Sequence, residues 1–220
     1  MPQKQSTDIN EIIRILKEEV KKYNKPAVSQ IAEKKDPFKI LIGTVLSART
    51  KDQVTGEAST RLFNLANTPN AMAELPLETI EQAIYPVGFW RQKAKNIVEL
   101  CRKLVNEYES KVPDELNELI TLPGVGRKTA NLVLTIGFGK LGICVDTHVH
   151  RISNRLGYVK TKIPEETEFA LRKKLPKKFW IIFNELLVTY GQNVCTPISP
   201  WCSKCPIEVY CMRVGVTKNR

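Results

Sequence analysis

The stretch LPGVGRKTANLVL, residues 122–134, decides the fold of this chain. A proline and two glycines separate two apolar segments, which predicts a tight turn between helices. Within the turn Gly124–Val125–Gly126, both glycines are expected to permit positive φ and a close approach of the backbone to a ligand. The N–H groups at the start of the next helix then suit an anion such as a DNA phosphate. An ordinary corner between helices is the alternative interpretation.

Lys128 lies at the start of that second helix, next to Arg127. A lysine at such a position usually contacts phosphate or stays solvated. The positive end of the helix, the neighbouring arginine and desolvation would all disfavour an ammonium ion. The position therefore suits a lysine that works as a free amine, and such an amine needs a partner that takes its proton.

Asp146 follows an apolar run and precedes a second helical segment in VDTHVHRISNRLG, residues 145–157. This placement predicts a helix N-cap, and capping alone would explain the residue. The functional interpretation is a carboxylate that accepts a proton or stabilises a developing cation. His148 and His150 are the only histidines, and their spacing favours structural or phosphate-contact roles over metal ligation.

Four of the six cysteines crowd into CTPISPWCSKCPIEVYC, residues 195–211, with the spacing C-x6-C-x2-C-x5-C. Four thiolates so close in sequence can surround one S4 site, which suits zinc or an iron–sulfur cluster. Cys101 and Cys144 stand alone on apolar segments, which predicts small buried side chains. The predicted ligands are Cys195, Cys202, Cys205 and Cys211.

The rest of the chain is predicted to be helical, because apolar residues recur at spacings of three and four and no segment alternates cleanly. The clearest helical segments are residues 9–23, 38–48, 52–66, 90–108, 164–175 and 178–190. The net charge of +11 favours a polyanion partner such as nucleic acid. The longest apolar runs are too short for a membrane span, and MPQKQSTD lacks the apolar core of a secretory signal. We therefore expect an intracellular protein.

In combination, these motifs resemble the endonuclease III family of helix-hairpin-helix DNA glycosylases. LSARTKDQ (46–53) and YPVGFWRQKAKNI (85–97) add to the resemblance, which covers residues 10 to 212. It implies an all-α, two-domain fold: a six-helix barrel with the hairpin at 30–140, and a discontinuous helical domain at 1–29 and 141–220. The second domain would carry a C-terminal [4Fe-4S] loop, and the active-site cleft would lie between the two.

The resemblance also implies an activity and a set of roles. Lys128 would be the nucleophile and Asp146 the assisting carboxylate of a bifunctional glycosylase/AP lyase that excises oxidised pyrimidines from double-stranded DNA. Arg49 would fill the gap left by the flipped base, and Phe89 would be the wedge against the opposite strand. The four cysteines would hold the [4Fe-4S] cluster, with zinc as the weaker alternative, and the protein would be a monomer. The predicted DNA contacts are Arg49, Phe89, Gly124, Val125, Gly126, Arg127 and His148.

The chain departs from the family pattern at two places. Glutamine is common at the gap-filling position, whereas this chain has Arg49, so the lesion range and the opposite-base preference are open. The loop TPISPW (196–201) has no basic residue for phosphate, although Lys204 lies nearby. A glycosylase for mismatched or other damaged bases is therefore a second hypothesis. A non-enzymatic, zinc-stabilised DNA-binding module is a third, which the pairing of Lys128 with Asp146 disfavours.

Overall fold

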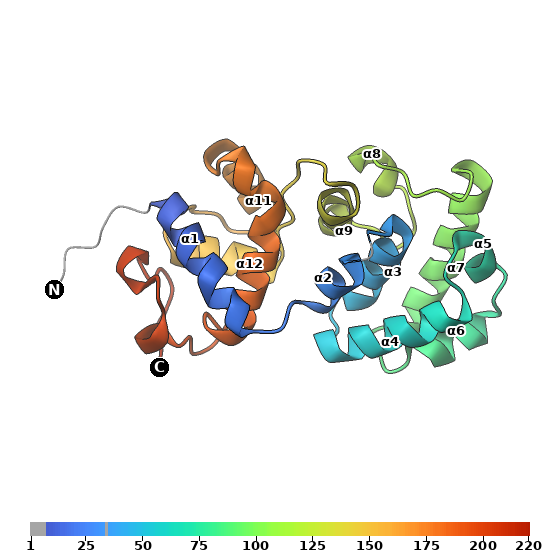
Figure 1. Cartoon of the computed structure of the whole chain (residues 1–220), viewed down its shortest axis with the longest axis horizontal. Coiled ribbons are helices and arrows are strands. Elements are labelled where there is room, and N and C mark those ends of the chain that lie inside the picture. The colour runs from blue at the N-terminus through green and yellow to red at the C-terminus, as the bar shows by residue number, and fades with distance from the viewer. Residues whose placement is uncertain (1–7, 34) are drawn as a thin grey trace. The chain divides into compact units, whose positions relative to one another are not determined.

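The computed structural model describes residues 8–33 and 35–220, and within them the chain forms helices and no strand, as predicted (Figure 1). The segment 1–7, on which the expectation of no secretory signal rested, and Lys34 lie outside the described residues. Within the described ranges no helix combines the length and apolarity needed to cross a membrane.

The chain divides into two compact units. One contains residues 27–142, and the other contains the N-terminal segment up to Pro26 together with Ile143–Arg220. Each unit has its own apolar core. The sequence-based boundaries were 30 and 140, and whether the two units act as separate domains stays a prediction.

The unit of residues 27–142 packs around α3 (Pro37–Ser47), in which Leu41 and Leu46 are fully buried. The Asp36 side chain caps this helix by accepting hydrogen bonds from the N–H groups of Phe38 and Lys39. Because α3 is apolar on all sides, other helices must surround it. The helices that pack against α3 are α2 (Ala27–Ala32), α4 (Asp52–Leu65), α7 (Trp90–Glu107) and α9 (Arg127–Leu132). The unit also contains α5 (Pro69–Ala73) and α6 (Leu77–Ile84), which pack on α7, and α8 (Leu116–Leu119), which packs on α9.

The other unit joins the two ends of the chain. In it α1 (Ile9–Glu19) buries Ile12, Ile13 and Leu16 in the core that also contains residues of α12 (Trp180–Asn193). The remaining long helices are α10 (Thr147–Arg155) and α11 (Pro164–Lys174). The cysteine segment follows α12 and contains two short 3₁₀ turns, Cys202–Lys204 and Glu208–Tyr210.

The structure corrects the sequence-based prediction at short elements. The helices α2, α5, α6 and α8 have four to eight residues and were not predicted. The segment ANTPN has the composition of a loop, yet Thr68 caps α5 and Pro69 occupies its first turn. After Leu132 the predicted helix continues as a π-helix at Val133–Gly137.

Candidate functional site

The hairpin predicted at residues 122–126 connects α8 to α9. The Val125 N–H donates to the Leu122 carbonyl at 3.0 Å and closes the turn. Leu122 and Val125 are both buried in the core of the 27–142 unit. These two apolar side chains anchor the turn in the core. The backbone at Gly124 and Gly126 is exposed to solvent.

The two glycines of the hairpin differ. Gly124 has φ of +76°, and a Cβ added there would lie 2.8 Å from Asn96 Nδ2. Gly126 has φ of −94° and ψ of 174°, an extended conformation open to any residue, so it does not use the positive φ that a glycine permits. No heavy atom lies within 4 Å of a Cβ added to Gly126, which leaves space for a ligand to approach the backbone.

This difference predicts unequal effects of alanine at the two positions. Gly124→Ala is expected to lower the free energy of unfolding by about 2 kcal/mol, because alanine is strained at positive φ and would crowd Asn96. Gly126→Ala is expected to cost less than about 1 kcal/mol, the scale of an N-cap preference. Denaturant titration of both variants measures the two costs, and equal costs would contradict this account.

Lys128 lies in the first turn of α9 and is exposed, and Arg127 is half-buried. The first backbone hydrogen bond of the helix runs from the Ala130 N–H to the Gly126 carbonyl at 2.9 Å. The N–H groups ahead of it therefore point out of the helix start, as the anion-site interpretation requires. The expected desolvation of Lys128 is not found, because its side chain is exposed.

Arg49 and Phe89 lie on two adjacent turns of the same unit. Arg49 follows the end of α3, and Phe89 immediately precedes α7. The Arg49 guanidinium carbon is 5.5 Å from the centroid of the Phe89 ring. The Phe89 side chain is 64% exposed, and Arg49 is also exposed. The structure thus brings together the two residues predicted to probe the duplex.

Asp146 caps α10, as predicted. One of its carboxylate oxygens accepts from the His148 N–H at 2.8 Å and from the Val149 N–H at 2.9 Å. The side chain is half-buried. The His148 ring nitrogen Nδ1 lies 3.1 Å from the Arg151 guanidinium, so His148 has a structural contact beside any contact with phosphate.

Two arginines of α10 hold the start of the cysteine segment, and the sequence-based prediction missed both. Arg151 donates to the Gly191 and Cys195 carbonyls, at 3.2 and 2.8 Å. Arg155 donates to the Thr196 carbonyl at 2.7 Å and to the Cys195 sulfur at 3.4 Å. Their spacing of four residues puts them on one helix face, but a solvated face has the same pattern, so the sequence carries no local signal for this role.

The cysteine sulfurs lie half-buried among groups that suit thiolates. All four thiols of the segment are unbridged. Besides the contact of Arg155 with Cys195, the Tyr190 hydroxyl lies 2.9 Å from the Cys205 sulfur. Burial raises the pKa of the Cys205 thiol to about 11, so a bound cation is needed to keep this sulfur ionised near neutral pH.

In the described part of the chain no three His, Cys, Asp or Glu side chains are arranged to hold a metal ion. The four sulfurs nevertheless form the soft donor set that zinc and iron–sulfur clusters prefer. Cys101 and Cys144 are buried, as predicted for cysteines outside the site.

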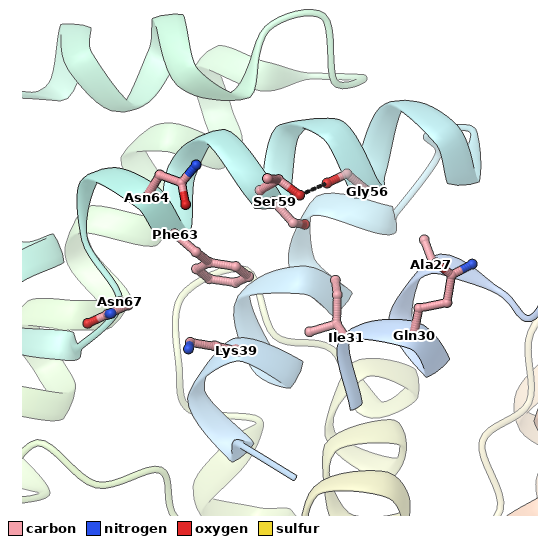
Figure 2. A pocket seen from close by; sticks show the side chains of 10 residues that line it. Ala27, Gln30, Ile31, Lys39, Gly56, Ser59, Phe63, Asn64 and Asn67 are labelled. Atoms are coloured by element: carbon pink, nitrogen blue, oxygen red, sulfur yellow. Dashed lines mark hydrogen bonds between the residues drawn. The ribbon is translucent and has the colours of Figure 1, made fainter. Parts of the chain in front are cut away.

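A depression of about 400 Å³ in the 27–142 unit is separate from all of these residues. Figure 2 shows its lining, which comes from α2, α3, α4 and the turn after α4 and includes Gln30, Lys39, Phe63 and Asn67. Within it the Thr60 hydroxyl donates to the Gly56 carbonyl at 3.0 Å. No residue predicted to act in catalysis, DNA contact or metal binding lines this depression.

Known proteins are similar to this chain in sequence and in fold. The family model of the HhH-GPD superfamily base excision DNA repair protein matches residues 42–177. An endonuclease III of Thermotoga maritima is 52% identical over 176 residues, which are 80% of this chain and 83% of that protein. The chloroplastic endonuclease III homolog 2 of Arabidopsis thaliana is 46% identical, over 83% of this chain and 50% of its own length.

Among solved structures, a trapped endonuclease III–DNA covalent intermediate, an estranged-adenine complex, superposes with a TM-score of 0.77 at 41% identity. The match covers 81% of this chain and 84% of that one. This chain is similar to these proteins in sequence and in fold. It also contains the hairpin, the exposed lysine after it, the capping aspartate and the cysteine segment. The chain therefore belongs to the endonuclease III family of helix-hairpin-helix base excision repair proteins.

Proposed function

We propose that this chain is a bifunctional DNA glycosylase/AP lyase that excises oxidised pyrimidines and then nicks the strand by β-elimination. The observation that carries the proposal is the exposed Lys128, which is the second residue of α9 and lies two residues after the hairpin turn. A relative at 41% identity was trapped as a covalent intermediate with DNA, which is the chemistry that a lysine nucleophile supplies.

DNA binding is assigned to the hairpin and to the two turns described above. A backbone phosphate would bind at Gly124, Val125 and Gly126, where the turn is open, with Arg127 supplying positive charge. Arg49 would fill the space of the flipped base, and Phe89 would wedge against the opposite strand. We assign a further phosphate contact to His148.

The chemistry begins when the free amine of Lys128 attacks C1′ of the flipped nucleotide. The bond from C1′ to the base breaks, and the base leaves with the electron pair and takes up a proton. Opening of the sugar gives an iminium ion, which acidifies the hydrogens at C2′. Loss of one C2′ proton and cleavage of the C3′–oxygen bond cut the strand, and water then releases the enzyme. Asp146 would accept the proton from the amine and stabilise cationic character at the sugar.

We assign Cys195, Cys202, Cys205 and Cys211 as the ligands of a [4Fe-4S] cluster, with zinc as the weaker alternative. The bound cluster would supply a cross-link for a segment that contains only short 3₁₀ turns. Arg155 would orient Cys195, and Tyr190 would orient Cys205 by donating a hydrogen bond to its sulfur.

Cys205→Ser is expected to lower the iron content of the purified protein several-fold and to destabilise the chain by several kcal/mol, since metal binding and folding are coupled. Iron and sulfide assays, the visible absorbance and thermal unfolding measure these effects. Cys144→Ala is the matched control, because this buried cysteine of the same unit is outside the predicted ligand set, and it should keep its iron. Stoichiometric zinc in place of iron in the unmodified protein would contradict the cluster assignment.

A second candidate function is removal of mismatched or other damaged bases by the same fold. Arg49 is the residue that favours this second function. A guanidinium only donates hydrogen bonds, whereas the glutamine amide common at this position in the family both donates and accepts them. A panel of duplexes with thymine glycol, a purine lesion, a mismatch or an abasic site, each treated with borohydride, separates the candidates. We expect trapping and cleavage at thymine glycol, and exclusive activity on another duplex would replace the proposed substrate. If the purified protein is colourless, contains zinc and cleaves none of these duplexes, it is the non-enzymatic DNA-binding module.

We further infer that the protein is a monomer that works on DNA inside the cell.

A further inference from the structure

The turns that carry Arg49 and Phe89 are held in an unusual conformation. Both residues adopt positive φ, of 52° and 58°, although neither is glycine. Such a conformation costs about 1 kcal/mol or more for a residue with a Cβ, so it persists only where neighbouring groups impose it. The groups that impose it here come from α7 and from the end of α3.

Lys93 is the central group. It lies one turn into α7, and only 7% of its surface is exposed. Its Nζ donates to the Leu46 carbonyl at 2.8 Å and the Ala48 carbonyl at 2.5 Å. The third partner is the Thr50 hydroxyl oxygen, at 3.2 Å. The three N–H bonds of one ammonium group thus bind three oxygens at the end of α3 and in the turn that contains Arg49.

None of these three partners is a carboxylate. Burial lowers the pKa of Lys93 to about 8, which reflects the cost of keeping an ammonium ion away from water. An apolar residue would fill the same volume without that cost. The retained charge is therefore best explained by the backbone oxygens that it organises.

Thr50 connects this group to the second turn. Its hydroxyl oxygen also accepts from the Gly88 N–H at 3.1 Å. A Cβ added to Gly88 would lie 2.6 Å from the Arg49 carbonyl oxygen, so the two turns meet backbone to backbone. One hydroxyl thereby fixes the turn of Arg49 against the turn of Phe89.

We propose that Lys93 and the Thr50 hydroxyl are positioning groups that hold Arg49 and Phe89 in the geometry needed to enter the duplex. Neither group touches DNA or the reacting sugar. This inference rests on the proposed function, because it assigns the two turns to opening the helix. It predicts that loss of either group lowers activity on duplex DNA. Cleavage of an abasic site in single-stranded DNA, which needs no base flipping, should be unaffected.

The first test compares Thr50→Val with Thr50→Ser. Valine keeps the shape and removes the hydroxyl, whereas serine keeps the hydroxyl. The hydroxyl accepts from Gly88 and Lys93 and donates to the Ala48 carbonyl at 3.3 Å. We expect Thr50→Val, which loses these hydrogen bonds, to lower kcat/KM on a duplex thymine-glycol substrate about tenfold. Cleavage of an abasic site in single-stranded DNA should stay within about twofold of the unmodified chain. Thr50→Ser should match the unmodified chain on both substrates.

The second test uses Lys93→Met, with Lys95→Met as the matched control. Lys95 lies on the same helix and is exposed, so its replacement removes one positive charge without touching the turns. We expect Lys93→Met to lower duplex activity by more than about tenfold, and to leave cleavage of the single-stranded abasic site within about twofold. It should also reduce the fluorescence gain of 2-aminopurine placed next to the lesion. Lys95→Met should change none of these. Circular dichroism before each assay verifies that the variants are folded.

Two results would overturn the inference: full duplex activity in Thr50→Val, or equal losses on duplex and single-stranded substrates in both variants. The second result would mean that the residues only stabilise the fold. Failure of the proposed function is distinguishable, because the unmodified chain itself would then form no borohydride adduct with either DNA.

Discussion

Replacement of Lys128 by glutamine is expected to abolish the borohydride-trapped adduct and to slow strand cleavage by about a thousandfold or more. Glutamine keeps a polar, unbranched side chain that is slightly shorter, but the lone pair of its amide nitrogen is delocalised and unavailable for attack on C1′. The Lys128 side chain is exposed, so the substitution should leave the free energy of unfolding unchanged within about 0.5 kcal/mol. Gel analysis of trapped adduct and nicked strand measures the two losses separately.

Lys177→Gln is the matched control for this experiment. Lys177 also begins a helical turn and is exposed, and it lies outside every group assigned to DNA or catalysis. It should trap DNA at the rate of the unmodified chain. An adduct that still forms with Lys128→Gln would show that another amine is the nucleophile, and the assignment of Lys128 would fall.

The parts of the site that the sequence revealed are those set by local geometry. The turn at residues 122–126 and the cap at Asp146 each depend on residues within four positions of one another, and both are present. Local propensity was sufficient because proline, glycine and aspartate act on the adjacent backbone. For the same reason the long amphipathic helices were predicted close to their observed ends.

The contacts that the sequence did not reveal join residues far apart in the chain. Lys93 reaches Leu46, 47 residues away, and Arg155 reaches Thr196, 41 residues away. In a single sequence both basic residues look like part of a solvated helix face, because no periodicity marks a charge that satisfies remote carbonyls. The backbone conformation of Gly126 could not be predicted for a related reason. A glycine is compatible with positive and negative φ, so its presence permits a conformation without selecting it.

Asp146 provides the second large expected effect. Replacing one carboxylate oxygen by an amide nitrogen, as in Asp146→Asn, separates its role as a helix cap from its proposed role in catalysis. An asparagine at this position would cap α10 as well as aspartate does, since the amide oxygen accepts the same hydrogen bonds from His148 and Val149. The amide cannot take a proton from an amine and has no negative charge for a cationic sugar. We therefore expect Asp146→Asn to lower excision of thymine glycol by about a hundredfold or more while leaving stability within about 0.5 kcal/mol.

The control is the other aspartate cap of the same unit. The Asp8 carboxylate accepts from the Asn10 and Glu11 N–H groups at the start of α1, at 2.9 and 3.4 Å. Asp8→Ala should cost about 1 kcal/mol of stability, as Asp146→Ala should, but it should leave excision unchanged. If Asp146→Asn excises the base at the normal rate, the carboxylate serves only as a cap. If Asp8→Ala slows excision as much as Asp146→Ala does, the loss belongs to the stability of the unit and no chemical role for Asp146 follows.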